Sequence, residues 1–181
     1  MKKPLVKIKF FSAFFLFILL LFSCVKDVDL GQYEEIVLPP QASLDLIFFN
    51  LTSEDFTGEQ NNRLRAADVT RLDFLDDDYI QNNLKSANLN FRFTNSFQRE
   101  FVAVIKLLSE GNGVQHEILI PIPAGTTDSP AKVNYTDIIN EDQINKIRRS
   151  IKMSVEITTH SGPFVDGELQ LQSRGFFYFE F

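Results

Sequence analysis

A mainly β fold is predicted by the sequence: a single antiparallel β-sandwich domain over residues 42–181, with one or two short helices. Apolar and polar residues alternate in several short segments, which is the pattern of half-buried strands. Turn-forming residues separate these segments. A chain of this length fits one domain and buries about 70% of its unfolded surface.

The clearest alternation is Leu89, Phe91 and Phe93, which predicts one apolar and one polar face. A similar inward face is expected for Leu44, Leu46 and Phe48. A nearly continuous apolar run over 101–108 predicts a strand covered on both sides, and the Gly-Asn-Gly turn at 111–113 joins it to 117–122 as a hairpin. Further strands are expected at 69–75, 151–158 and 169–181, the last with a bulge at Arg174 and Gly175.

Two short helices are expected between the strands. Asp76, Asp77 and Asp78 can cap a helix over 79–85, because carboxylates accept the free amide hydrogens of a helix start. A second helix over 143–149 has cap candidates in Asn140 and Asp142. The polar segment 53–68 is expected to be a long loop, of the kind that carries function or is mobile.

The first 23 residues have the pattern of an export signal. Four lysines precede an apolar run from Phe10 to Phe22, and Ser23 is a small residue before the expected cut. The run falls short of the ~20 apolar residues that span a bilayer, so a permanent membrane helix is disfavoured.

The sole cysteine, Cys24, follows that signal directly. Leu21-Phe22-Ser23-Cys24 resembles a bacterial lipobox, in which the cysteine thiol receives a diacylglyceryl group and becomes the new N-terminus. Acyl chains such as palmitate, present in two or three copies, give stable membrane attachment. The alternative is an ordinary cleaved signal with a cysteine nearby.

Residues 24–41 are expected to form an acidic, proline-containing tether. Within it, Lys26 and Asp27 resemble the short signal that exports lipoproteins of Bacteroidetes to the outer face of the outer membrane. The alternative is a solvated charged segment. The whole pattern is similar to small lipoproteins of Bacteroidetes, flavobacteria in particular. The resemblance implies a bacterial outer-membrane location through the lipid on Cys24, and leaves the surface or periplasmic face open.

Charge excludes some partners. Once the signal is removed, 24 acidic and 14 basic residues remain, a net charge of −10. Nucleic-acid binding needs a basic face, so no nucleic-acid partner is expected. Electrostatic adhesion to anionic lipid is disfavoured for the same reason.

No catalytic residue, metal or cofactor is predicted. His116 and His160 lie at the ends of expected strands, with no spacing that suits zinc. The acidic residues Asp73 and 76–78 could hold calcium, but helix capping is favoured because the alternating calcium-loop pattern is missing.

The aromatic residues favour a core. Beyond the signal the chain has 13 Phe, 4 Tyr and no Trp, whereas sugar-binding platforms prefer Trp and Tyr. Phe at alternate positions up to Phe181 resembles the terminal signature of outer-membrane β-barrels, but a final strand inside a sandwich is favoured.

The leading hypothesis is a lipid-anchored envelope protein that is not an enzyme and acts as a binding or accessory module, with an outer-membrane protein as partner. A second hypothesis is a small-molecule or glycan-binding lipoprotein, with an aromatic-lined cleft beneath the 53–68 loop. A small outer-membrane β-barrel, and a hydrolase built around His116 or His160, are further alternatives.

Overall fold

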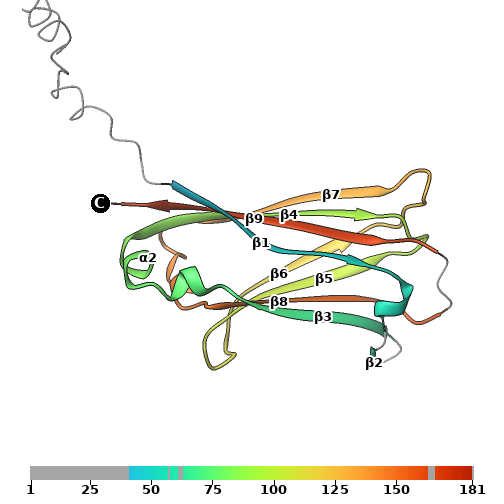
Figure 1. Cartoon of the computed structure of the whole chain (residues 1–181), viewed down its shortest axis with the longest axis horizontal. Helices are drawn as coiled ribbons and strands as arrows, with labels where there is room; N and C mark the ends of the chain where they lie inside the picture. Colours follow the sequence, from blue (N-terminus) through green and yellow to red (C-terminus); the bar gives the residue numbers. More distant parts are fainter. Residues whose placement is uncertain (1–40, 57, 61–62, 163–165, 181) are drawn as a thin grey trace, which may run out of the picture. The chain divides into compact units, whose positions relative to one another are not determined.

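A computed structural model describes residues 41–56, 58–60, 63–162 and 166–180, which fold as an antiparallel β-sandwich of two sheets (Figure 1). The predicted fold class is therefore confirmed. Within the described residues, no helix combines the length and the apolar character needed to cross a bilayer.

The first sheet has four strands in the order β1-β9-β4-β7, and every neighbouring pair is antiparallel. It joins the first and last described strands of the chain, side by side at one end of the sheet (Figure 1). Its strands are β1 (Gln41–Leu51), β9 (Leu169–Phe179), β4 (Leu84–Asn95) and β7 (Ala131–Ile139).

The second sheet has five strands in the order β2-β3-β8-β5-β6, again all antiparallel. The β5–β6 pair is the hairpin that the sequence predicts, with Asn112 at positive φ in its turn. The strands are β2 (Gly58–Gln60), β3 (Arg63–Arg71), β8 (Lys152–His160), β5 (Phe101–Leu108) and β6 (Val114–Ile122).

The core lies between the sheets and is built from alternate residues of the strands. Leu89, Phe91 and Phe93 are each at most 2% exposed, as their alternation predicts. Phe97 and Phe101 pack their rings 5.5 Å apart at one end of the sandwich. Among the described residues, six phenylalanines are buried in this core, as the sequence interpretation of the aromatic residues expects: Phe56, Phe91, Phe93, Phe97, Phe101 and Phe177.

The run 101–108 was expected to be covered on both sides, and that prediction is wrong. Val102 and Val104 are only half-buried, while Ala103 and Ile105 are fully buried. The described residues form two layers, so the outer face of each sheet is left to solvent. β-Branched side chains suit such a half-buried surface as well as a buried one.

The prediction of a long loop at 53–68 is also wrong. This segment contains the 3-10 turn η2 (Ser53–Asp55), the short β2 and the first half of β3. β3 ends at Arg71, so the strand expected at 69–75 gives way to a second 3-10 turn, η3 (Asp73–Asp76). The inward residues of β3, Leu64 and Ala66 among them, are only partly buried. The strand therefore needs few large apolar side chains, and its sequence shows only a weak alternation.

The helices are shorter than expected. α2 (Asp78–Asn83) has Asp77 as its N-cap residue, and the Oδ1 of Asp77 accepts from the Tyr79 amide at 2.9 Å, so a cap from this acidic cluster is confirmed. α3 (Asn145–Arg148) has Ile144 at its N-cap and no side-chain cap bond, so the caps proposed at Asn140 and Asp142 are wrong. A backbone turn from the Asn140 carbonyl leads into this segment instead.

Candidate functional site

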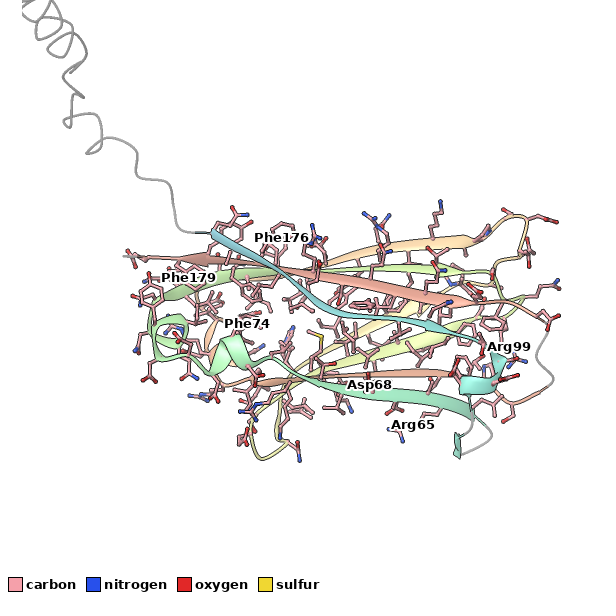
Figure 2. The ribbon with its side chains drawn as sticks, viewed as in Figure 1. Arg65, Asp68, Phe74, Arg99, Phe176 and Phe179 are labelled. Atoms are coloured by element: carbon pink, nitrogen blue, oxygen red, sulfur yellow. The ribbon has the colours of Figure 1, made fainter. Side chains whose placement is uncertain are left out.

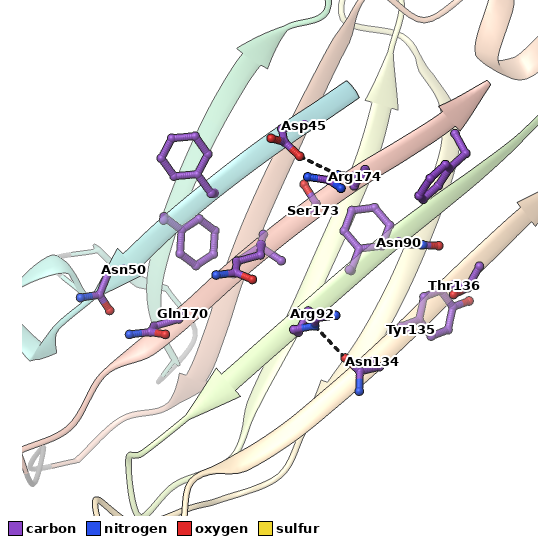
Figure 3. Close-up of a pocket in the computed structure, with 16 residues that line it drawn as sticks. Asp45, Asn50, Asn90, Arg92, Asn134, Tyr135, Thr136, Gln170, Ser173 and Arg174 are labelled. Carbon is purple, nitrogen blue, oxygen red and sulfur yellow. Dashed lines mark hydrogen bonds and ion pairs between the residues drawn. The ribbon is translucent and has the colours of Figure 1, made fainter. Parts of the chain in front are cut away.

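A shallow groove of about 1030 Å³ lies on the outer face of the four-stranded sheet (Figure 3). All four strands contribute to it. Its lining is rich in carboxamide and aromatic side chains and holds three charged residues, Asp45, Arg92 and Arg174. The sequence hypothesis places an aromatic-lined cleft beneath the 53–68 segment. The groove in the structure lies elsewhere, since no residue of 53–68 lines it.

The strand register sets the layout of the groove. In one row across the sheet, Asp45 pairs with Arg174, which lies opposite Asn90. In the next row, Gln172 lies between Phe48 and Arg92. Because side chains alternate between faces every second residue, these residues all point away from the core. β7 completes the two rows with Thr136 and Asn134.

A β-bulge in β1 brings Phe48 into this face. The register shifts between Asp45 and Phe48, so that Leu46 and Ile47 are both buried. The Ser173 hydroxyl holds the bulge: it donates to the Ile47 carbonyl at 2.6 Å and accepts from the Ile47 amide at 2.9 Å. An extra residue in one strand reverses the faces beyond it. Phe48 is consequently 79% exposed.

Two sequence expectations fail at this bulge. Phe48 was expected to face the core with Leu44 and Leu46, but it faces solvent, and Leu44 is itself 37% exposed. The bulge was expected in β9 at Arg174 and Gly175, yet β9 pairs without interruption there.

Figure 2 shows a further aromatic residue of this face, Phe176, on the outer side of β9, whereas Arg65 lies on the outer side of the opposite sheet. Phe176 is half-buried and lines the groove. Tyr135, which is 36% exposed, alternates with Asn134 and Thr136 and so belongs to the inward set of β7; it reaches the groove lining only at the edge of the sheet. Two aromatic rings of the outer face, Phe48 and Phe176, thus border the polar middle of the groove.

The two arginines of the groove differ in their electrostatic surroundings. Arg174 forms an ion pair with Asp45, with Nε and Oδ1 2.8 Å apart. Arg92 donates from Nε to the side-chain Oδ1 of Asn134 at 3.2 Å (Figure 3). Among the described residues, no carboxylate lies within ion-pair distance of Arg92. The groove therefore has a net charge of +1 in a chain whose formal charge is −6.

Asn90 contributes an unsatisfied acceptor. Its Oδ1 is buried and has no hydrogen-bond partner among the described residues. Leaving a buried polar atom without a partner costs about 1–3 kcal/mol. Such atoms in a groove are typical of positions where a ligand or an ordered water completes the bonding.

The two histidines are far from each other, and neither lines this groove. His116, near the start of β6, bonds through Nε2 to Asp137 Oδ2 of β7 at 2.7 Å and so links the two sheets. His160 ends β8 and is exposed, as expected for a strand end. The register places them at opposite ends of the five-stranded sheet.

The acidic cluster is occupied by protein contacts. Asp77 caps α2, while Asp73 and Asp76 bond the guanidinium of Arg71 at 2.6 and 3.0 Å. Glu110 bonds the same group at 2.9 Å. The hydrogen bond to Asp73 is the main cause that raises the pKa of Arg71 above its ordinary value. Within the described part of the chain, no group of three or more metal-ligating side chains comes together.

The predicted lipidation residue Cys24 and the export residues Lys26 and Asp27 lie outside the described residues. The groove itself was missed by sequence reasoning. The signal was partly visible, because Asn90 and Arg92 occupy the polar positions of a clear alternation. Nothing local in the sequence shows that β9 and β7 flank them.

Comparison with known proteins gives no family. No family model matches the sequence, and the search of curated proteins found no match. Similarity to solved structures is low. The VP2 subviral particle protein of infectious bursal disease virus has a TM-score of 0.43 and 13% identity, over 80% of this chain and 38% of that one.

Two further structures are similar to the same extent. A protein of Parabacteroides distasonis, described as secreted, has a TM-score of 0.39 and 16% identity over 62% of this chain and 38% of its own. The enzymatically active domain of tailspike protein 4 from bacteriophage CBA120 has a TM-score of 0.39 and 12% identity, over 79% and 20%. The chain thus spans well under half of each of these structures, and such distant likenesses carry no functional argument.

Proposed function

We propose that this chain is a non-catalytic envelope protein, anchored by a lipid on Cys24, that binds a glycan chain in the groove of the four-stranded sheet. The observation that carries the proposal is the composition of the groove: the exposed ring of Phe48 and the half-buried ring of Phe176 lie beside several carboxamides on one solvent-facing surface.

The side-chain chemistry suits sugars. A carboxamide offers a donor and an acceptor together, which matches the paired hydroxyl groups of a sugar ring. Four exposed carboxamides, Asn50, Asn134, Gln170 and Gln172, line the groove. The apolar faces of sugar rings stack on aromatic side chains, and Phe48 presents 79% of its surface to solvent for this purpose.

The dimensions suit an extended ligand. Neighbouring strands are about 4.8 Å apart, so a groove across four strands extends over about 14 Å. It is open to solvent along that distance. A short oligosaccharide lying across the strands fits such a surface better than a compact cofactor, which prefers an enclosed pocket.

The envelope part of the proposal rests on the sequence. The basic head, the apolar run to Phe22 and the sole cysteine at Cys24 support export and lipidation. Mass spectrometry of the mature N-terminus tests it, and an unmodified Cys24 thiol would remove the anchor. A protein partner in the outer membrane stays a prediction from the sequence.

Replacing Phe48 with alanine is expected to weaken oligosaccharide binding by at least about 10-fold, because a ring worth about 1.5–3 kcal/mol when covered is lost. The measurement is isothermal titration calorimetry on the full-length protein in detergent micelles, with a panel of neutral and carboxylated oligosaccharides. Phe48 faces solvent, so the fold is expected to tolerate the change.

The matched control is Leu119→Ala. Leu119 is also a large exposed apolar residue, 60% exposed, but it lies on β6 of the other sheet. We expect its variant to bind like the wild-type protein. Equal losses in both variants, or no binding to any member of the panel, would contradict the proposed function.

A further inference from the structure

Arg92 is the feature of the groove that glycan binding in general does not explain. It is exposed, and its only hydrogen bond among the described residues uses Nε. A guanidinium has five N–H donors and no acceptor, so its two terminal nitrogens remain available to a ligand. Arg174, on the neighbouring strand β9, is by contrast already neutralised by Asp45.

The neighbours of Arg92 are uncharged and polar. Gln172 lies beside it on β9 and Asn134 on β7, in the same row of the sheet. A planar guanidinium matches a carboxylate with two parallel hydrogen bonds, and such charge-assisted bonds are about twice as strong as neutral ones. An anionic group bound at Arg92 would thus have carboxamides on either side for hydroxyl groups.

We infer that the groove selects acidic saccharides, and that Arg92 binds the carboxylate of a uronic acid unit. The inference rests on the proposed glycan-binding function and adds the class of sugar. Arg92 and its carboxamide neighbours supply the anion contact, and Phe48 in the same row supplies a ring for stacking.

Asn90 supports a sugar acid over a simple anion. It lies two residues before Arg92 on the same face of β4, about 7 Å away. Its unpartnered Oδ1 would accept from a hydroxyl group, which an acetate ion does not carry. A uronic acid carries a carboxylate and hydroxyl donors on one ring. The oxygen is covered in the structure, so this contact requires the Asn90 carboxamide to turn about its terminal torsion, which is broad for such groups.

The overall negative charge of the chain does not prevent this contact. Interactions between exposed charges are screened beyond about 8 Å at physiological salt, so the local pairing of Arg92 outweighs distant carboxylates. We expect the affinity for acidic saccharides to fall as salt rises, and the affinity for neutral ones to stay constant.

The test compares tetragalacturonate with its methyl ester, which has the same sugar rings but uncharged, methylated carboxyl groups, by calorimetry on the full-length protein in detergent. The wild-type protein is expected to bind the acid about 10-fold more tightly than the ester. Arg92→Gln is expected to abolish this preference while it still binds the ester.

Lys132→Gln is the control. Lys132 is exposed on the outer face of β7 and lies outside the groove lining. Its change to glutamine removes one positive charge, as Arg92→Gln does. Its variant should keep the preference. Equal binding of acid and ester by the wild-type protein, or a preference that survives in Arg92→Gln, overturns the inference and leaves the proposed function standing. No binding of either probe, or of any neutral oligosaccharide, overturns both.

Discussion

Replacing Asn95 with alanine is expected to lower the free energy of unfolding by about 3 kcal/mol or more. Its side chain is 0% exposed and makes three hydrogen bonds to backbone groups. The Nδ2 amide donates to the Arg99 and Pro123 carbonyls at 2.9 and 2.8 Å, and Oδ1 accepts from the Phe97 amide at 2.9 Å. Each bond contributes about 1 kcal/mol, and the buried backbone groups left behind lose the partner that this side chain gives them.

Urea unfolding followed by circular dichroism measures this effect. Asn134→Ala is the matched control, because Asn134 is exposed on β7 and its side chain bonds a single exposed arginine among the described residues. We expect it to change the unfolding free energy by less than about 0.5 kcal/mol. Similar losses for both variants would show that Asn95 does not hold the turn between β4 and β5.

The second large effect concerns Phe177, which is 1% exposed and packs its ring 5.0 Å from that of Phe74. Phe177→Ala is expected to cost about 3–5 kcal/mol, as other large-to-small changes of buried phenylalanine do. Gly175 lies directly beneath this ring: a Cβ placed there would lie 2.5 Å from Phe177 Cε2. Gly175→Ala is therefore expected to cost about 1–3 kcal/mol through overpacking.

A double-mutant cycle separates this contact from general damage. In the Phe177→Ala background the clash is absent, so Gly175→Ala should cost little, with a coupling of at least about 1 kcal/mol. The measurement is again urea unfolding. A cost for Gly175→Ala that is the same in both backgrounds would mean that the ring does not require glycine at this position.

The strands with a clean two-residue period could be predicted from the sequence. In β4 and β8 one face is buried and the other faces solvent, so Phe91 and Val155 sit at alternating apolar positions. β7 could not be predicted, because its inward positions are not all apolar. One of them is Asp137, which bonds His116 and interrupts the alternation with the outward Lys132, Asn134 and Thr136. An edge strand has less apolar surface to bury, and its pattern is correspondingly weak.

The groove could not be predicted because it depends on pairing over long distances in the chain. Asp45 and Arg174 are neighbours only because β1 pairs with β9, and a shift of one residue would move every side chain to the other face. Phe48 shows how sensitive this is. Without the bulge that Ser173 holds, its place in the alternation would put it in the core.

The most direct measurement of the central claim is an NMR titration of the ¹⁵N-labelled full-length protein in detergent micelles with tetragalacturonate, followed through the side-chain amide signals. The proposed site predicts saturable shifts for Asn90, Asn134 and Gln172, and none for Gln115 on β6 or Asn82 in α2. Saturable shifts confined to the five-stranded sheet, with the groove signals unmoved, would contradict it.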